Sequence, residues 1–336
     1  MRDIERLQQE IDQLKNELDV TIVAHYYQKD EVFEIADITG DSLELAKRAK
    51  ESGSEWILFC GVGFMGQSVK ILAPEKRVAM PKIACCAMAR MIDSTYFDAS
   101  VEAMKKAGIK EEDILPITYI NSGAEVKAKV GKMGGSVCTS SSAVKIIEKA
   151  IKSGKKILFV PDRCLGQNVA RMMGLKSAVI GIDSDEAIKE ADIVCYNGFC
   201  SVHQLFTLKD VEFFKKRYPG IKIAVHPECD PAVCEVADFV GSTSQIIKYV
   251  KSLPEDQKVA VGTEYNLVHR LRDKNTYVLS STKPECPTMN ETTLEDVRDT
   301  LQAIKKGDVI NEIFVDEDTI KWSKIALERM FEYLEE

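Results

Sequence analysis

The sequence contains no pair of cysteines spaced as C-x-x-C, although ten of its 336 residues are cysteine. A zinc ribbon, a thioredoxin motif and a ferredoxin-type cluster loop all depend on such closely spaced pairs. None of these local metal or redox motifs is therefore predicted. Any metal site must take its ligands from distant parts of the chain.

Long hydrophobic runs and an excess of positive charge are also missing. The apolar runs are far shorter than the roughly 18 residues that a membrane span needs. The residues after Met1 lack the apolar core of a signal peptide, so we expect a cytoplasmic protein with no membrane association. The net charge of −8 argues against nucleic-acid binding, which needs a basic face.

The order of predicted elements indicates an α/β fold. A chain of this length suits two or three domains of about 100 residues each. From Val20 onward, predicted strands alternate with helices, which favours parallel sheets covered on both faces. The alternation recurs three times as a β-α-β-α-β-α-β unit. We therefore predict three homologous α/β/α sandwich domains around a pseudo-threefold axis, with an active site at the centre, at residues 19–90, 91–202 and 203–290.

Two flanking segments lie outside the repeats. In residues 3–18, apolar residues recur at three- and four-residue steps, which predicts an amphipathic helix. This helix could form a dimeric coiled coil, but it is shorter than three heptads, so packing on the protein's own body is favoured. Residues 291–336 are predicted to form two helices on either side of Val309–Val315. We expect both terminal segments to pack on the first repeat.

Three cysteines follow the fourth predicted strand of the three repeats, namely Cys86, Cys200 and Cys286. Thiolates at equivalent positions would meet at the common centre and could hold one iron–sulfur cluster. Three thiolates leave one of four irons without a protein ligand, which suits Lewis-acid catalysis, whereas four thiolates suit electron transfer. Either member of the Cys85-Cys86 pair could face the centre.

The other cysteines have simpler interpretations. Cys60 and Cys195 lie inside apolar strands and are expected to be small buried hydrophobic residues. Cys229 and Cys234 could form a disulfide in a hyperthermophile, and are otherwise expected to be free thiols.

Hydroxyl clusters open a helix in each repeat, at Ser42, at Ser140 and at Ser242-Thr243. One such residue is adequately explained as a helix N-cap. Three clusters at equivalent positions instead suggest a pocket for an anionic substrate, because helix N-termini bind phosphate and carboxylate. Polar side chains also end the first strand of each repeat; they are His25, Tyr27, Tyr119, Asn121, His226 and Glu228.

Within this polar set, His226-Pro227-Glu228 places an acid and a base side by side, which suits proton transfer. His203 follows Cys200 closely but is given no separate role. His269 lies on a predicted helix and is expected to be structural. Asp162-Arg163 could bind a carboxylate or could form an ion pair that holds its own turn.

Taken together, these motifs resemble the quinolinate synthase family. The resemblance rests on A-H-Y-Y-Q, I-A-D-I-T-G-D-S-L, Y-I-N-S, C-T-S, P-D-R-C-L-G, C-S-V-H-Q, H-P-E-C, V-G-S-T and V-G-T-E, in the family's order and spacing. It runs from about Val20 to the helix after Cys286 and does not include the N-terminal helix.

The resemblance implies a [4Fe-4S] cluster held by one cysteine from each domain, and Cys86, Cys200 and Cys286 match the ligand positions. It implies condensation of iminoaspartate with dihydroxyacetone phosphate to quinolinate, phosphate and water, in de novo NAD biosynthesis. It also implies a transient contact with L-aspartate oxidase, which makes the imine. Some family members carry a C-x-x-C-x-x-C run at the last ligand, but here no cysteine follows Cys286, so a disulfide switch in that run is excluded.

The same resemblance implies roles for individual residues. The positions that match substrate-binding residues are His25, Ser42, Tyr119, Asn121, Ser140, His226, Glu228 and Thr243, with Tyr27 and Ser242 close by. Glu228 with His226 is expected to move protons, and Tyr119, His25 and Tyr27 complete the expected catalytic set.

Two other classes of protein are alternatives. Diphthamide-forming enzymes also gather one cysteine from each of three domains, but they use S-adenosylmethionine to modify a protein. The H-x-E motif and the hydroxyl clusters fit a small dianionic substrate better. A non-catalytic iron–sulfur sensor would need a partner surface or a basic DNA-binding helix, and neither is visible in the sequence.

Overall fold

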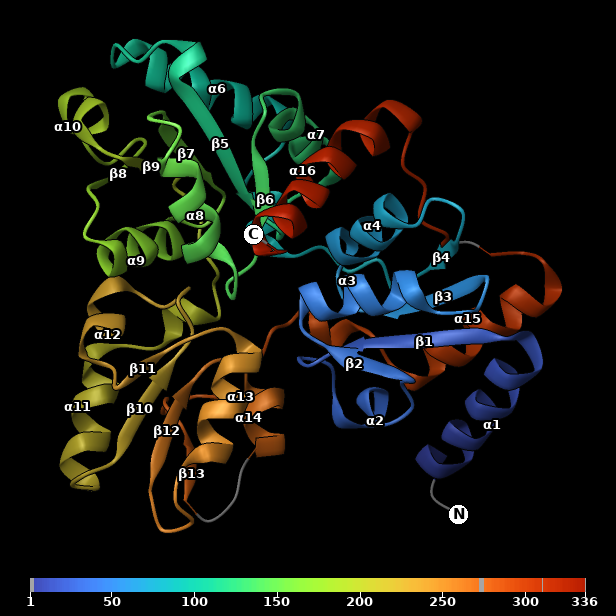
Figure 1. Ribbon diagram of the computed structural model, residues 1–336. Coiled ribbons are helices and arrows are strands. Elements are labelled where there is room, and N and C mark those ends of the chain that lie inside the picture. Colours follow the sequence, from blue (N-terminus) through green and yellow to red (C-terminus); the bar gives the residue numbers. More distant parts are fainter. Residues whose placement is uncertain (1–2, 272–274, 310, 336) are drawn as a thin grey trace.

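The computed structural model describes residues 3–271, 275–309 and 311–335. It confirms the predicted fold class, because three parallel sheets, each flanked by helices, lie around a common centre (Figure 1). The strands of the three sheets fall within the residue ranges predicted for the three repeats. In the described part of the chain, no helix is long and apolar enough to cross a membrane.

The first sheet has the strand order β2-β1-β3-β4, with every neighbouring pair parallel. All five residues of β3 are buried, as expected where helices cover both faces of a parallel sheet. The elements of this domain are α1 (Asp3–Leu18), β1 (Val20–His25), α2 (Asp30–Phe33), β2 (Ile38–Gly40), α3 (Ser42–Glu51), β3 (Trp56–Cys60), α4 (Gly63–Leu72), β4 (Arg77–Ala79) and α5 (Ala87–Arg90).

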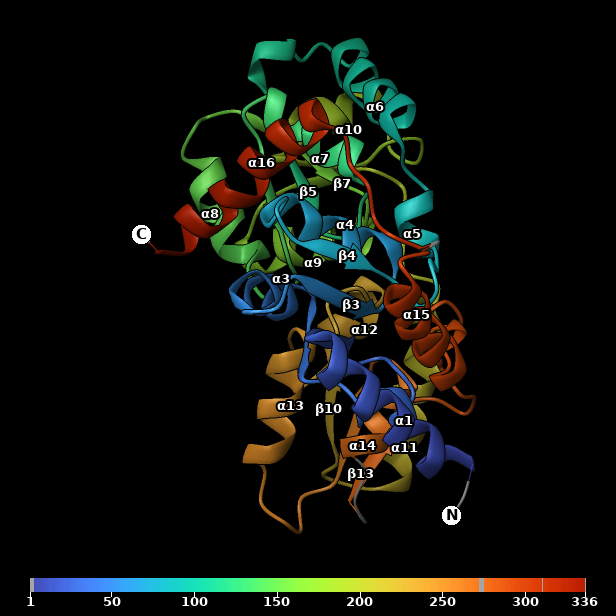
Figure 2. The ribbon, with the colours of Figure 1, turned by 90° about the vertical axis from the view of Figure 1, so that its right-hand side faces the viewer.

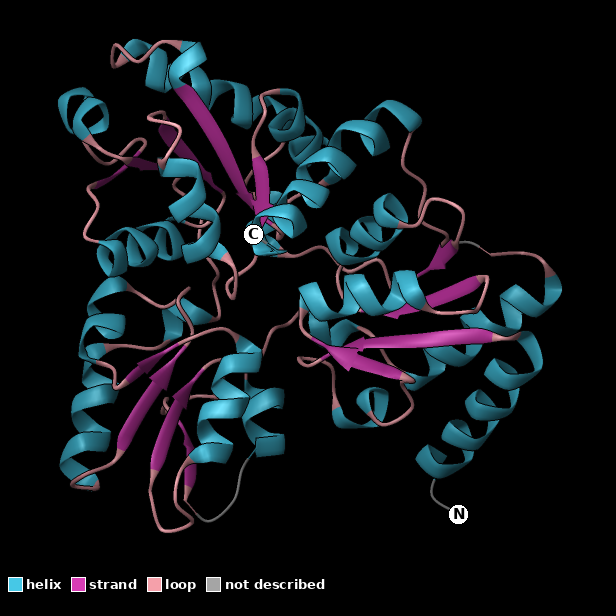
Figure 3. Ribbon diagram, in the orientation of Figure 1, coloured by secondary structure: helices cyan, strands magenta, loops and turns pink. Residues whose placement is uncertain are grey.

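The third sheet repeats this topology with the order β11-β10-β12-β13 (Figure 3). The strand pairing matches that of the first sheet. The first strand of this domain, β10, pairs with both β11 and β12, as β1 pairs with β2 and β3. Its elements are α11 (Leu208–Arg217), β10 (Lys222–Val225), α12 (Pro231–Val236), β11 (Phe239–Val240), α13 (Thr243–Ser252), β12 (Val259–Gly262), α14 (Tyr265–Leu271) and β13 (Thr276–Val278), preceded by a short 3₁₀ turn, His203–Leu205.

The second sheet departs from the four-strand prediction. Its order is β6-β5-β7-β9-β8, so an additional edge strand, β8, pairs with β9. At three residues, β8 is too short to show a periodic pattern in the sequence. The elements are α6 (Ser94–Lys106), the 3₁₀ turn Glu111–Asp113, β5 (Ile114–Tyr119), α7 (Ala124–Lys132), β6 (Ser136–Cys138), α8 (Ala143–Ile151), β7 (Lys156–Val160), α9 (Arg163–Met173), β8 (Ser177–Val179), α10 (Asp185–Glu190) and β9 (Ile193–Cys195).

The N-terminal helix packs on the body of the protein, as favoured from its length. Ile11 and Leu14 of α1 are buried in a cluster that includes Leu301 of α15 (Leu294–Lys306), and both helices cover the first sheet (Figure 2). An ion pair of 2.7 Å between Lys305 and Glu17 joins the two helices at their surface.

The last helix, α16 (Glu317–Glu335), differs from the expectation that the whole C-terminal segment covers the first repeat. It lies mainly against α7, β6 and α8 of the second domain, and in the first domain it contacts α4 and, through Phe331, Lys47 of α3 (Figure 2). Ala326, Leu327 and Met330 are fully buried in the core cluster shared by the first two domains. That shared core explains the position of α16, because its apolar face covers the junction between the domains.

The α7–α16 contact requires a glycine. A Cβ built at Gly131 of α7 would lie 2.0 Å from the backbone oxygen of Trp322. Only the absence of a side chain allows the two helix backbones to approach so closely.

Replacing Gly131 with alanine should therefore force α16 away from α7 and lower the free energy of unfolding by about 1–3 kcal/mol. Chemical denaturation measures this change. The matched control is Gly53→Ala, where nothing lies within 4 Å of the added Cβ, and a change within about 0.5 kcal/mol is expected. Equal stability of the two variants would contradict the packing argument.

Candidate functional site

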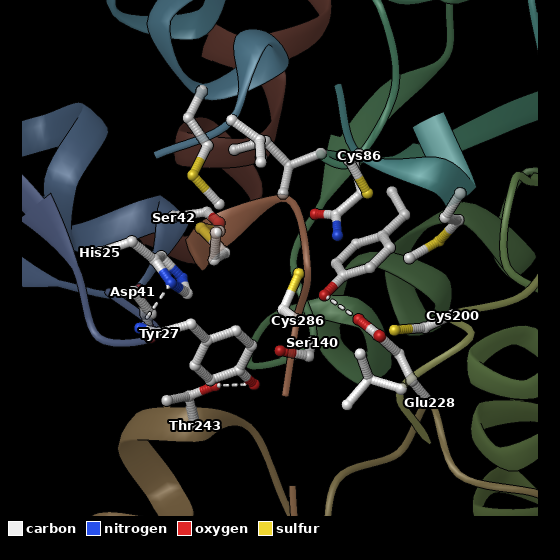
Figure 4. Close-up of a pocket in the computed structure, with 18 of the residues that line it drawn as sticks. His25, Tyr27, Asp41, Ser42, Cys86, Ser140, Cys200, Glu228, Thr243 and Cys286 are labelled. Carbon is white, nitrogen blue, oxygen red and sulfur yellow. Dashed lines mark hydrogen bonds between the residues drawn. The ribbon is translucent and has the colours of Figure 1, made fainter. Parts of the chain in front are cut away.

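Residues from all three domains line one cavity at the centre of the molecule (Figure 4). The carboxyl ends of parallel strands open onto it, which is where α/β sheets commonly bind ligands. The lining comprises His25, Tyr27, Asp41, Ser42, Val62, Phe64, Met65, Cys86, Met88, Tyr119, Ile120, Asn121, Thr139, Ser140, Cys200, Val202, His203, His226, Glu228, Thr243, Cys286, Thr288 and Met289. Every residue singled out from the sequence for this site is present except Ser242.

The three expected cysteines reach the cavity from three different domains. Cys86 immediately precedes α5, Cys200 precedes the 3₁₀ turn at His203, and Cys286 precedes the 3₁₀ turn Met289–Glu291. Figure 4 shows Cys86, Cys200 and Cys286 around the same space. The neighbouring Cys85 is exposed and is not part of the lining, so the structure places Cys86 at the centre.

A shared local geometry surrounds the three sulfurs. Each thiol accepts a hydrogen bond from backbone N–H groups two or three residues further on: Met88 and Ala89 for Cys86, His203 for Cys200, and Thr288 and Met289 for Cys286. Hydrogen bonds to sulfur stabilise thiolate ligands and tune iron–sulfur clusters. Three half-buried thiols with N–H donors directed at them fit an iron–sulfur cluster.

Burial without a metal disfavours the thiolate form of these cysteines. It raises the pKa of Cys86 to about 12, and it also raises the pKa of Cys200 and of Cys286. A bound metal reverses this preference, because a coordinating thiol is deprotonated outright.

Another group of potential metal ligands overlaps this site. One ligand atom each from Cys200, His203 and Glu228 lie within 4.8 Å of one another. His203 and Glu228, however, already use these atoms in hydrogen bonds to one another and to neighbouring hydroxyls. The cysteines are therefore the better ligand set.

Glu228 is the buried charge at the centre of the polar network. Its Oε1 accepts a hydrogen bond from the Tyr119 hydroxyl (2.6 Å), and its Oε2 lies 2.9 Å from His203 Nδ1. Burial alone would raise its pKa, but the His203 and His226 rings and these hydrogen bonds hold the pKa of Glu228 below its usual range. Glu228 is thus a carboxylate at neutral pH.

The network continues from Glu228 to the first domain. His203 Nε2 lies 3.1 Å from the Thr263 hydroxyl, which is 2.9 Å from the Tyr27 hydroxyl. Tyr27 also lies 3.0 Å from the Thr243 hydroxyl (Figure 4). A continuous chain of hydrogen bonds therefore joins the second domain at Tyr119 to the first domain at Tyr27, through the third.

His25 and His226 occupy equivalent strand ends and are held in the same way. In each, Nδ1 accepts a hydrogen bond from the backbone N–H two residues on, from Tyr27 (3.1 Å) and from Glu228 (3.3 Å). Burial lowers the pKa of His25 to about 4 and that of His226 to about 3, so both rings are neutral at pH 7. With Nδ1 as acceptor, the proton of each neutral ring is on Nε2.

At the start of α3 and of α13, a capping residue is followed by a hydroxyl residue that lines the cavity, and the cap of α3, Asp41, lines the cavity as well. Asp41 accepts the backbone N–H of Glu44, and Ser242 accepts that of Gln245, so these two residues cap α3 and α13. The next residues, Ser42 and Thr243, line the cavity. Ser242 thus has the helix-cap role that was the simpler interpretation of its sequence.

Asn121 and Ser140 come from the second domain. Among the described residues, the buried Oδ1 of Asn121 has no hydrogen-bond partner, although Asn121 lines the cavity. A buried amide oxygen without a partner is costly, so this atom is available to a ligand. Ser140 makes a side-chain hydrogen bond to Tyr119.

Several functional residues were not identified from the sequence. His203 and Thr263 carry the hydrogen-bond chain, and Asp41 connects α3 to the third domain through Ser244 (2.6 Å). The short spacing between Cys200 and His203 was a usable signal for His203. Thr263 lies in the V-G-T-E motif directly after β12, but the motif alone assigned it no role.

The other cysteines discussed from the sequence, and Asp162, lie outside the cavity lining. Cys229 and Cys234 are free buried thiols, and Cys60 and Cys195 are buried. Asp162 caps α9 by accepting the backbone N–H of Leu165.

Comparison with known proteins identifies the family. The family model described as "Quinolinate synthetase A protein" matches residues 9–332. The quinolinate synthase of Helicobacter pylori (strain HPAG1) is 58% identical over 97% of this chain and 98% of its own length. Those of Rhodopirellula baltica and Streptomyces coelicolor are each 40% identical, over 97% and 93% of this chain and 90% and 84% of their own lengths. The family match reaches into α1 and α16, beyond the motifs that carry the resemblance. Because the family model covers residues 9–332 and these relatives are 40–58% identical over more than nine-tenths of this chain, the protein belongs to the quinolinate synthetase A family.

Proposed function

We propose that this chain condenses iminoaspartate with dihydroxyacetone phosphate to form quinolinate, phosphate and water, with a [4Fe-4S] cluster held by Cys86, Cys200 and Cys286. The observation that carries the proposal is the meeting of one thiol from each domain in a cavity that also contains the Glu228 network. The proposal places the enzyme in the cytoplasm and includes supply of the unstable imine by L-aspartate oxidase.

The cluster, when bound, supplies a Lewis-acidic iron, because three thiolates leave one of its four irons open to carboxylate, nitrogen or hydroxyl ligands. The protein supplies the ligands for the other three. The backbone N–H groups directed at each sulfur favour the thiolate form needed for binding.

Anionic substrates must be recognised without basic side chains, because the cavity lining contains no lysine or arginine. Ser42 and Thr243 instead stand in the first turn of α3 and α13, where free backbone N–H groups and the helix dipole favour phosphate or carboxylate. The neutral rings of His25 and His226 add Nε2–H donors. These groups bind anions and hold two substrates in one orientation, which lowers the entropic cost of condensation.

Glu228 is the proposed general base. It is ionised and buried, and its oxygens are oriented by Tyr119 and His203. It can take a proton during enamine formation and return it during isomerisation and loss of water. Tyr119 and Asn121 orient the intermediate, with the free Asn121 Oδ1 accepting a hydrogen bond from it.

The direct test is anaerobic incubation of the reconstituted protein with iminoaspartate and dihydroxyacetone phosphate, followed by chromatographic detection of quinolinate. Formation of quinolinate supports the proposal. Its absence from protein that carries a full complement of iron and sulfide would refute it.

Changing Cys86, Cys200 or Cys286 singly to serine should prevent cluster assembly, because a serine oxygen is a poor substitute for a thiolate on iron. After anaerobic reconstitution, iron should fall from about four atoms per chain to below about one. Iron and sulfide analysis with visible absorbance measures the change.

Cys85→Ser is the matched control for this series, since Cys85 adjoins Cys86 but is exposed. It should retain the cluster. Full iron content in any of the three ligand variants, or its loss in Cys85→Ser, would contradict the assignment.

Replacing Glu228 with glutamine should lower the rate of quinolinate formation by about 100-fold or more, because an amide cannot accept the substrate proton. Iron content should remain unchanged. Steady-state assays compare this variant with Glu235→Gln, an exposed position on α12 where wild-type activity is expected. A wild-type rate in Glu228→Gln would remove Glu228 from the mechanism.

A further inference from the structure

Lys127 of α7 is a completely buried lysine that does not line the cavity. Its Nζ donates to the backbone oxygens of Ile120 (2.8 Å) and Ser122. Both acceptors are carbonyl groups rather than a carboxylate, so no ion pair offsets the cost of burying the amine at these bonds. We therefore ask what the buried amine does for the turn whose carbonyls it binds.

The two carbonyls flank Asn121, the residue whose amide oxygen is buried in the cavity wall without a partner. The turn begins directly at the end of β5, after Tyr119. Its other contacts are single hydrogen bonds between neutral groups, such as Ser122 Oγ to the Tyr119 carbonyl (3.0 Å) and the Ile120 N–H to the Cys138 carbonyl (2.8 Å). Lys127 instead binds the carbonyls on both sides of Asn121 with one amine, and so fixes the backbone of this turn.

The same amine also supports a second part of the cavity wall. Its Nζ lies 5.5 Å from the centre of the Phe64 ring, and Phe64 lines the cavity from the first domain. Burial lowers the pKa of Lys127 to about 7, with Glu125 acting in the opposite direction. The amine keeps hydrogen-bond donors for both carbonyls in either protonation state.

We propose that Lys127 is a positioning residue: it holds the 120–122 turn so that the Asn121 side chain is presented to the substrate. This inference rests on the proposed function, because it assigns Asn121 to substrate binding. It predicts that Lys127 acts on the reaction mainly through Asn121.

A double-mutant cycle tests this dependence. Lys127→Met, Asn121→Ala and the double variant are compared with wild type for kcat/KM under anaerobic conditions. Lys127→Met alone should lower kcat/KM by about 10- to 100-fold, the loss expected when a binding group is displaced by about 1 Å, with iron content unchanged. In the Asn121→Ala background the same substitution should change kcat/KM by less than about threefold, because the two residues act as one unit.

Lys129→Met is the matched control, because Lys129 is on the same helix but pairs with Asp98 at the surface (2.7 Å). It should behave as wild type. An equal loss from Lys127→Met in both backgrounds, or no loss in either, would overturn the proposal. If Lys127→Met does not fold, Lys127→Leu, which also removes the donor, is read by the same cycle and the same criteria.

Hydrogen–deuterium exchange separates failure of this proposal from failure of the proposed function. The amides of residues 119–123 should exchange faster in Lys127→Met than in wild type or Lys129→Met, without any substrate present. If the wild-type protein with a full cluster makes no quinolinate, the proposed function fails, and the exchange result still tests the turn. Unchanged exchange at 119–123 would overturn the role of Lys127.

Discussion

The central constraint on this structure is the burial of the Glu228 carboxylate. A charge removed from water is stable only when its oxygens are hydrogen-bonded. Here the donors come from Tyr119 in the second domain and His203 in the third, and the chain continues to Tyr27 in the first. Separation of the domains would expose these groups to water or leave them without hydrogen-bond partners. The domain arrangement and the ionisation of Glu228 therefore depend on one another.

The site uses backbone N–H groups, repeated in the same local arrangements, in place of charged side chains. Each of the three cavity cysteines precedes a turn whose N–H groups act on its sulfur, and two strand-end histidines accept an N–H from two residues further on. A capping residue followed by a cavity-facing hydroxyl occurs at both α3 and α13. Backbone groups cannot move independently of the fold, so the site is organised before any ligand binds.

Two positively charged side chains contact the backbone next to cavity-lining residues but do not line the cavity themselves. Lys127 binds the carbonyls beside Asn121, and Arg270 of α14 donates to the carbonyls of Tyr26 and Gln28 next to Tyr27. In both places a cation holds backbone rather than substrate. The cavity lining contains no lysine or arginine, and its hydrogen-bond network is centred on the buried Glu228 carboxylate.

The amino-acid sequence by itself determined the α/β class and the threefold repetition, and all but one of the residues that it assigned to the site line the cavity, Cys86, Cys200 and Cys286 among them. The fold class and the repeats follow from local pattern, because strand periodicity and helix starts are properties of neighbouring residues, whereas the roles expected of the site residues came from the resemblance to a known family. The tertiary structure alone decided which of Cys85 and Cys86 faces the cavity, that Ser242 is a cap, and that α16 covers the second domain. It also revealed Thr263 and Lys127, because a partner found 60 residues away, or a buried amine behind a turn, leaves no periodic trace in the chain.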